Sequence, residues 1–303
     1  MATATSTRPP IKAISRHTSP LALWHLLSLD APTVAVLWTW FIASANHVHL
    51  PLYSALAMAI TVWMLYAADR LMDARLMDAR LMDARLLDAS PTHHEDLEAR
   101  HYFHHRHRTS FLFGILAASV ALAVLLPSLE AEAIHLYLIL GGMVAGYFIL
   151  IHATRSAHRL PKEIAVGLCF AAATFIPTVA RRPELRLPLL PSALFFAALC
   201  SFNCLFIYAW EHEGHSTHRL THAITRHAIA NLPLLTIFLT LASAALAIFD
   251  RHAARSIPSA IALSAALLLL LHTRRHAIAR TTLRAAADLA LITPLLLLPF
   301  LYQ

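Results

Sequence analysis

Apolar residues fall into nine long runs along this chain, separated by short polar segments. The runs occupy 21–45, 51–69, 109–127, 133–152, 162–180, 189–210, 229–250, 256–273 and 283–302. A helix needs about 20 apolar residues to cross a bilayer core of about 30 Å, and the runs are near that length. Because backbone groups in lipid must be paired within their own segment, we predict that each run is helical. The pattern indicates an all-α membrane protein, a bundle of about nine transmembrane helices.

Prolines mark several run ends, and three prolines lie inside runs. Pro32, Pro177 and Pro294 each remove a backbone donor. Within a helix this loss produces a kink or frees nearby carbonyl groups. We therefore expect local irregularity in the first, fifth and last runs.

The basic residues indicate how the runs cross the membrane. Of the 24 Lys and Arg residues, 19 lie in the N-terminal arm and in the loops that follow even-numbered runs, and five lie on the other side. Cytoplasmic loops carry an excess of Lys and Arg. We therefore predict a multi-pass protein of the cell (inner) membrane, with the N-terminus in the cytoplasm and the C-terminus outside.

Composition supports the membrane assignment. The chain is 58% hydrophobic and 14% charged, whereas a soluble domain carries about 25% charged residues. The formal net charge of +7 is explained by topology, so we expect no nucleic-acid partner. Each of the three cysteines lies inside an apolar run, as small buried hydrophobic residues do.

The chain divides into an arm and one membrane domain. Residues 1–20 are polar and basic and are expected to form a cytoplasmic N-terminal arm. Residues 21–303 form a single transmembrane domain, interrupted at about 70–108 by a cytoplasmic insertion. The insertion begins with a pentapeptide repeat, LMDAR, over 71–89. Leu, Met, Ala and Arg are strong helix formers, so the second helix should continue beyond the membrane.

Two carboxylates stand where the second run meets the cytoplasm. Asp69 and Asp73 are four residues apart and share one face of a helix. Such a pair could hold Mg²⁺, whose other ligands would be water and phosphate oxygens. An ordinary polar helix end explains the pair at least as simply.

A second polar cluster follows the sixth run. Glu211, Glu213 and His215 emerge at the same predicted boundary, and Asn203 lies within the run. Acidic residues at membrane depth are costly and tend to face a cavity. Both acidic helix ends are predicted on the same side of the membrane, which suggests one polar cavity between helices.

These features together resemble the UbiA superfamily of intramembrane prenyltransferases. The second segment reads Tyr66-Ala-Ala-Asp69-Arg70-Leu-Met-Asp73. The segment that opens at Lys162-Glu163 and the last segment, Asp288 to Pro294, are also similar to that family. The resemblance extends from about residue 20 to residue 302.

The resemblance implies a transferase that uses a prenyl diphosphate. Asp69 and Asp73 would hold one Mg²⁺ ion, and Glu211, Glu213 and His215 a second. The residues that would contact substrate are Arg70, Tyr147, Arg155, Lys162 and Asn203. The metals would stabilise the leaving diphosphate, and the allylic cation would alkylate an aromatic or lipid-like acceptor among membrane lipids.

Some positions depart from the family pattern and leave alternatives open. Leu65 stands where the family has Asn, and the second motif has Glu211 and His215 in place of two aspartates. A family member that has lost catalysis, and binds a lipid or partner, is one alternative. A transporter of a cation or metal is another, suggested by the histidine-rich stretch at 93–108.

Two carboxylates lie inside runs rather than at their ends. Asp30 precedes Pro32 in the first run, where a functional role and support of a helix break are nearly equal expectations. For Asp288, in the last run, we expect pairing with a neighbouring helix.

Overall fold

The computed structural model is a bundle of helices and describes residues 20–86, 103, 106–154, 161–211, 213, 222–250 and 254–300. No strand occurs in these ranges. The helices are α1 (Pro20–Leu26), α2 (Asp30–Ala45), α3 (Leu52–Leu86), α5 (Arg108–Leu125), α6 (Ala131–Thr154), α7 (Lys162–Arg181), α8 (Arg186–Glu211), α9 (Ala223–Ala230), α10 (Leu232–Phe249), α11 (Ser256–Arg274), α12 (Arg280–Leu289) and α13 (Pro294–Leu297). Short 3₁₀ turns are η1 (Leu126–Ser128), η2 (Pro183–Leu185), η4 (Arg275–Ala277), η5 (Ala290–Ile292) and η6 (Leu298–Phe300).

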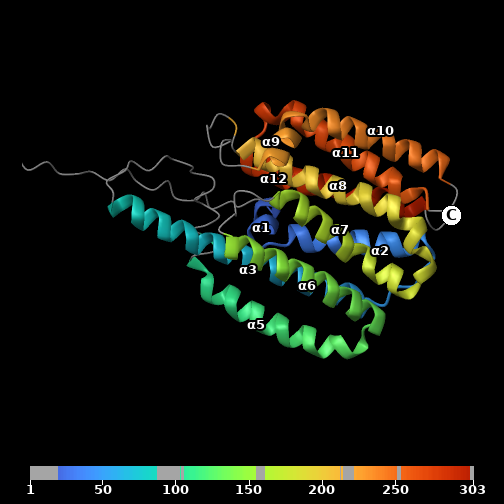
Figure 1. Cartoon of the computed structure of the whole chain (residues 1–303), viewed down its shortest axis with the longest axis horizontal. Coiled ribbons are helices and arrows are strands. Elements are labelled where there is room, and N and C mark those ends of the chain that lie inside the picture. Colours follow the sequence, from blue (N-terminus) through green and yellow to red (C-terminus); the bar gives the residue numbers. More distant parts are fainter. Residues whose placement is uncertain are drawn as a thin grey trace, which may run out of the picture.

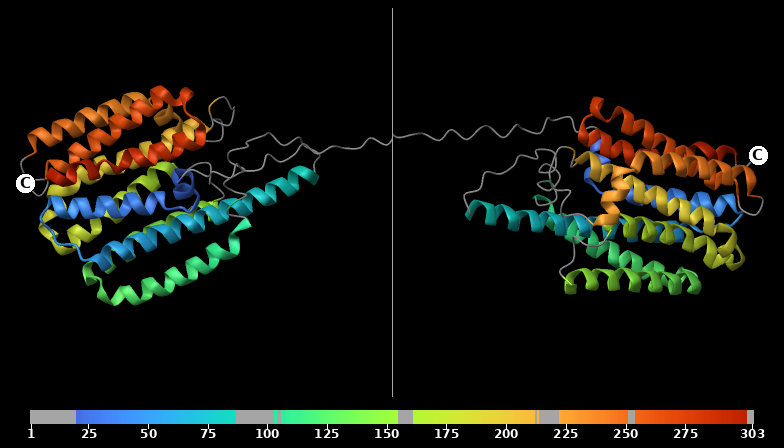
Figure 2. Two further views of the ribbon diagram at one scale, coloured as in Figure 1. Left: turned by 180° about the vertical axis from the view of Figure 1, so that it is seen from behind. Right: turned by 45° about the horizontal axis from the view of Figure 1, so that its top comes forward.

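The long helices lie side by side along one common direction (Figures 1 and 2). Helix α5 forms one edge of the bundle, against α3, and α10 forms the opposite edge, against α11 (Figure 1). Helices α2, α7 and α8 occupy the middle, where their side chains form the main apolar core. In that core the rings of Trp38 and Phe196 lie 4.3 Å apart between centroids.

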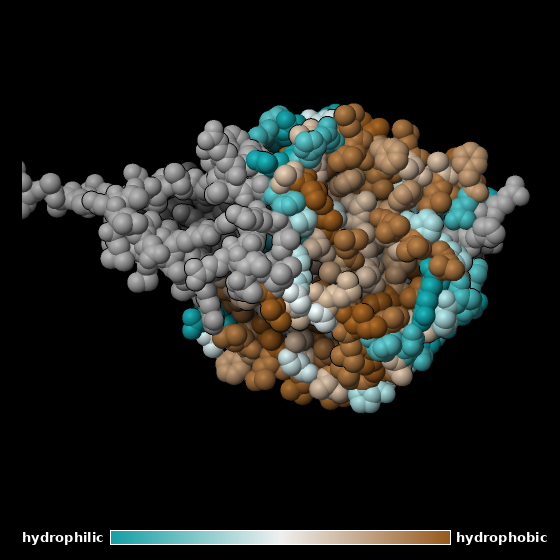
Figure 3. All heavy atoms as spheres, viewed as in Figure 1, coloured by the Kyte–Doolittle hydropathy of each residue, from teal (hydrophilic) through white to brown (hydrophobic). Residues whose placement is uncertain are grey.

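Apolar side chains also cover much of the outside of the bundle. Figure 3 shows a broad hydrophobic surface with hydrophilic residues gathered towards its ends. Phe113, Leu138 and Phe238 are among the large side chains that are exposed, as expected for a surface in contact with lipid. Within the described residues, six helices are long and apolar enough to cross a membrane. An all-α membrane protein is thus supported.

All nine apolar runs are helical in the structure, but not every run forms one long helix. The first run is divided into α1 and α2, and the last into α12, η5, α13 and η6. The seventh run starts in the last residues of a separate short helix, α9, and continues in α10, which has Pro233 in its first turn. The number of membrane crossings therefore stays a prediction.

Helix α3 continues well beyond the apolar run, as the repeat predicted. It covers 35 residues from Leu52 to Leu86, which at about 1.5 Å per residue is about 52 Å. Its spanning part ends at Met72. The remainder extends past the other helices at one end of the bundle (Figure 1).

The break between α1 and α2 is closed by side chains from α3. Ser28 adopts a left-handed backbone conformation with φ of 59°, which ends α1 and redirects the chain. Arg70 donates to the carbonyl oxygen of His25 at 2.7 Å, and Trp63 donates to that of Leu27 at 3.1 Å. Trp63 thus supplies a side-chain donor at the break, and Arg70 adds a second donor to the His25 carbonyl, which also accepts from the backbone N–H of Ser28 at 3.2 Å.

The break in the last segment lies just before Pro294 and is closed in a similar way. The indole of Trp38 donates to the carbonyl oxygen of Leu291 at 2.7 Å, and both residues are buried. Thr293 donates to the carbonyl of Ala260 at 3.0 Å, and its hydroxyl lies 2.7 Å from that of Ser264. The irregularity predicted at Pro294 is confirmed, whereas α7 continues through Pro177 and Pro32 lies in the first turn of α2, just after the break of the first run.

Replacing Trp38 with Phe should test the second closure. Phe keeps an aromatic ring in the core but leaves the buried carbonyl of Leu291 without its donor. We expect the free energy of unfolding to fall by about 0.6–1.7 kcal/mol, the range measured for hydrogen bonds within membrane bundles. Titration of the purified protein with SDS in micelles measures this change. Trp40→Phe is the matched control, because Trp40 is 43% exposed; equal losses in both variants would contradict the assignment.

The end of the bundle opposite the α3 extension carries paired charges. Arg181 lies 3.0 Å from Glu130, Arg186 contacts Glu132, and Arg182 contacts Glu184. Several of the arginines that the sequence places outside the cytoplasm are therefore neutralised by glutamates.

Candidate functional site

A network of polar side chains lies between α1, α2, α3, α8 and α12, where these helices approach one end of the bundle. Its centre is Asp30, which is 1% exposed. The carboxylate accepts from Arg70 at 3.0 Å, from the backbone N–H of Ala31 at 3.0 Å, and contacts His25 Nδ1 at 2.6 Å. Both oxygens of Asp30 are thus used, and its charge is paired with that of Arg70.

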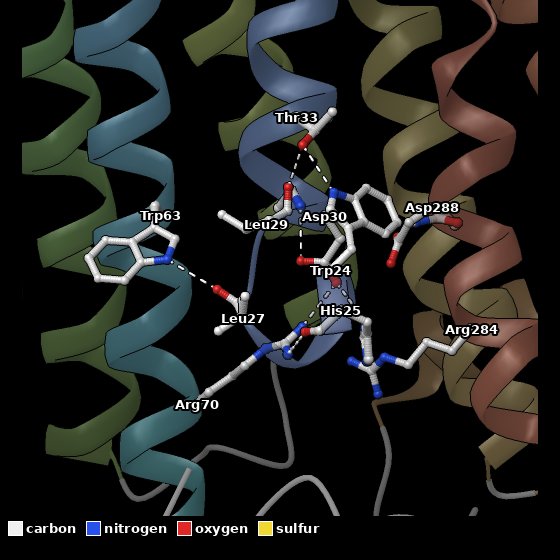
Figure 4. A network of polar contacts seen from close by, with 12 residues as sticks. Trp24, His25, Leu27, Leu29, Asp30, Thr33, Trp63, Arg70, Arg284 and Asp288 are labelled. Atoms are coloured by element: carbon white, nitrogen blue, oxygen red, sulfur yellow. Dashed lines mark hydrogen bonds and ion pairs between the residues drawn. The ribbon is translucent and has the colours of Figure 1, made fainter. Parts of the chain in front are cut away.

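The last segment supplies the other half of this network. Asp288 of α12 accepts from the side-chain amide of Asn203 in α8 at 3.0 Å. One turn earlier on α12, Arg284 donates to Glu211, the last residue of α8. Arg70 and Arg284 extend towards His25 from opposite sides of the site (Figure 4). The pairing that we expected for Asp288 is confirmed by its bond to Asn203.

The two halves meet at the carboxylates. Ligand atoms of His25, Asp30 and Asp288 all lie within 4.8 Å of one another. Two negative charges at such a separation repel by about 3.5 kcal/mol at an effective dielectric constant of 20. Three carboxylates (Asp30, Asp288 and Glu211) face two guanidinium groups, so the described charges of the network do not cancel unless a proton or another cation is held there.

Helix α3 directs Arg70, and not Asp69, into this network. Arg70 is 5% exposed, and its guanidinium also lies 5.4 Å above the ring of Tyr66. Asp69 is exposed. Adjacent residues on a helix point about 100° apart, and here Arg70 points into the bundle while Asp69 lies at its surface. Asp73 lies on α3, but its side chain is outside the described part of the chain.

Two carboxylates of the second acidic cluster form ion pairs with arginines. Glu211 pairs with Arg284, and Glu213 accepts from Arg275 at 3.2 Å. His215 lies outside the described residues. Glu211 belongs to the same polar network as Arg70, which brings the ends of α3 and α8 to one site through Asp30 and Asp288.

The other residues that were predicted to contact substrate lie in different parts of the chain. Asn203 is buried within the network, where it binds Asp288. Lys162 is exposed at the first turn of α7, and Tyr147 is partly buried on α6. Arg155 is outside the described residues. Asn203 thus contacts the network directly.

The predicted magnesium ligands can be compared with the donor sets that the structure assembles. Within the described ranges, His25, Asp30 and Asp288 are the group of three metal-ligating side chains that come together. Asp69, Glu211 and Glu213 do not form such a group, and Glu211 and Glu213 are occupied by arginines. The described residues therefore do not fit the predicted two-ion site as they stand, and magnesium binding by that set stays a prediction.

His25 and Arg284 were not among the predicted site residues. His25 lies in a short helix near the start of the first run, and Arg284 sits at the start of the last run. A usable signal was the presence of charged or titratable residues beside apolar runs, because such groups need partners in a membrane. Which partners they find depends on contacts between distant segments.

Comparison with protein-family models, with curated proteins and with solved structures finds no match for this chain. Function is therefore inferred from the geometry of the polar network and its place in the bundle.

Proposed function

We propose that this chain is a UbiA-like membrane prenyltransferase that transfers an isoprenoid group from a prenyl diphosphate to an aromatic or lipid-like acceptor. The observation that carries the proposal is the single polar network joining the ends of α3 and α8 at one end of an apolar bundle. Such an arrangement offers a charged site for a diphosphate beside an apolar region for an isoprenoid chain.

The cationic groups of the site suggest where the diphosphate binds. Arg284 uses Nη1 on Glu211, while its buried Nε has no hydrogen-bond partner within the described residues. A guanidinium with a free donor suits phosphate oxygens. Lys162, exposed at the N-terminus of α7, would add a second cation at a helix end that favours anions. Arg70 is already paired with Asp30, so we assign it to positioning.

The acidic residues of the site would act after the diphosphate is bound. Asp69 is exposed on α3, next to Arg70, and stands at the end of the spanning part of the helix. In the proposal it binds the substrate's counter-ions from the cytoplasmic side. Glu211 holds Arg284 in place through Nη1, which leaves the Nε donor of this guanidinium for the diphosphate.

Replacing Asp69 with Ala should abolish prenyl transfer without affecting membrane insertion. The test uses purified protein, labelled farnesyl or geranylgeranyl diphosphate, Mg²⁺ and a membrane lipid extract. Release of diphosphate and formation of a labelled lipid product are measured together. Glu184→Gln, at the opposite end of the bundle, is the control and should retain full activity. Unchanged turnover in Asp69→Ala would remove this residue from the reaction.

Binding of the prenyl diphosphate without release of diphosphate would favour a member that has lost catalysis. The pairing of Glu211 and Glu213 with arginines supports that alternative, because both carboxylates are already engaged. If the protein neither binds the prenyl diphosphate nor releases diphosphate from it, both forms of the proposal are excluded.

Cation transport is a second candidate, and the two interrupted helix segments favour it. The breaks between α1 and α2 and between α12 and α13 lie close to His25, Asp30 and Asp288. Interrupted membrane helices carrying polar residues are typical of transporters. Uptake of a divalent cation into liposomes containing the protein would distinguish this function from prenyl transfer.

A further inference from the structure

We propose that His25, Asp30 and Asp288, with the side-chain carbonyl of Asn203, form a binding site for one divalent cation such as Mn²⁺. This site is separate from the acidic helix ends that the sequence singled out. It depends neither on prenyl transfer nor on transport, because it concerns only what the interior of the bundle binds.

The three donors lie close enough together to bind a single ion. One nitrogen and two carboxylate oxygens, from α1, α2 and α12, have their ligand atoms within 4.8 Å of one another. Ligands of one ion at about 2.0–2.2 Å lie at most about 4.4 Å apart. Small side-chain adjustments would therefore bring all three onto a single ion. The donors come from both interrupted segments, so an ion would join the two breaks.

Asn203, which binds Asp288, carries a buried acceptor that has no hydrogen-bond partner among the described residues. Asn203 is 7% exposed, and its amide nitrogen donates to Asp288 at 3.0 Å, which places the amide against that carboxylate. Its carbonyl oxygen Oδ1 is buried without a hydrogen-bond partner among the described residues. A buried acceptor without a partner is costly. A cation, or a water molecule bound to it, would satisfy this oxygen.

The negative charge of Asp288 also favours a bound cation. Asp30 has Arg70 as an ion-pair partner. Asp288 has no ion-pair partner within the part of the chain that the structure describes, and its hydrogen bond from Asn203 comes from a neutral amide. With Asp30 so close, Asp288 requires a positive charge or a proton. A divalent cation shared by both carboxylates supplies that charge and places it where both can reach it.

The ligand types indicate the kind of ion. Carboxylate and amide oxygens suit Mg²⁺, Ca²⁺ and Mn²⁺, whereas imidazole favours transition metals. Mn²⁺ accepts both kinds of ligand. It also suits the test, because histidine-rich stretches such as residues 93–108 bind zinc or nickel more readily than manganese.

The test measures Mn²⁺ binding to the purified full chain in lipid nanodiscs after treatment with a chelator. Electron paramagnetic resonance reports free Mn²⁺ and, in pulsed form, the coupling of a bound ion to an imidazole nitrogen. We expect one ion per chain with that coupling. His25→Ala should remove the coupling, and both His25→Ala and Asp288→Asn should weaken binding by at least about tenfold. The matched controls, His227→Ala and Glu184→Gln, alter residues elsewhere and should bind as the unaltered chain does.

A further variant keeps the test decisive if those substitutions prevent folding. Asn203→Asp places a third carboxylate beside Asp288, so it should bind Mn²⁺ more tightly and should be stabilised by added Mn²⁺ in thermal unfolding. Absence of bound Mn²⁺, persistence of the nitrogen coupling in His25→Ala, or no effect of Mn²⁺ on Asn203→Asp would overturn the proposal. In the last case a proton, and not a metal ion, would be what the two carboxylates share.

Discussion

Arg70→Met is expected to lower the free energy of unfolding by about 3–5 kcal/mol, the cost of leaving a buried charge without its partner. Met fills a similar volume but donates no hydrogen bond. The variant leaves Asp30, which is 1% exposed, without its guanidinium partner. It also removes the donor to the carbonyl of His25 at the end of α1. Equilibrium unfolding of the purified protein in mixed micelles measures the loss.

Two further variants separate the charge from the packing. Arg70→Met combined with Asp30→Asn should recover part of the lost stability, because the buried negative charge is then absent. Arg182→Ala is the control: it removes an arginine that is 50% exposed, paired with an exposed glutamate, and should change stability little. A loss in Arg70→Met no larger than in Arg182→Ala would show that this network does not support the fold.

Gly167→Leu should disrupt the contact between α7 and α8. A Cβ atom added to Gly167 would lie 2.6 Å from the backbone nitrogen of Ser201 and 2.7 Å from the carbonyl oxygen of Ala197. Both are backbone atoms of α8, so the two helices would have to separate. Small residues at such contacts allow close packing of membrane helices. Overpacking costs about 1–3 kcal/mol in cores that can adjust, and we expect a loss at or above the upper end of that range.

Thermal unfolding in detergent, followed by circular dichroism, measures the effect of Gly167→Leu. Gly142→Ala is the matched control, because a Cβ at that position meets nothing within 4 Å. Ala is a better helix former than Gly by about 1 kcal/mol, so the control should be neutral or slightly stabilising. Equal stability of the Gly167→Leu variant and the unaltered chain would contradict the close contact of α7 with α8.

The apolar runs were sufficient to predict where helices lie, because a run of about 20 apolar residues in lipid has few other options. They did not predict where the first helix breaks. The break is at Ser28, which adopts a left-handed conformation although it is not a glycine. The residue type therefore gives no signal of the break. Arg70 and Trp63 of α3 stabilise it by donating to the carbonyls of His25 and Leu27. Such compensation comes from another helix, so it has no local sequence signal.

The candidate site was predicted in part. The sequence indicated that acidic helix ends on α3 and α8 approach one place, and Glu211 does belong to the polar network. It could not indicate whether Asp69 or Arg70 faces the bundle, because a helix with apolar residues on every side gives no preferred face. The meeting of Asp30 with Asp288 joins opposite ends of the chain and depends on tertiary packing alone.

The LMDAR repeat sets how far α3 projects beyond the bundle. The LMDAR unit adds five residues at a time to the part of the helix beyond Met72. Each gain or loss of one unit would shift the helix tip by about 7.5 Å, while Arg70 and the residues before it keep their places. A change in the number of units therefore lengthens or shortens this projection and leaves the interior of the bundle as it is.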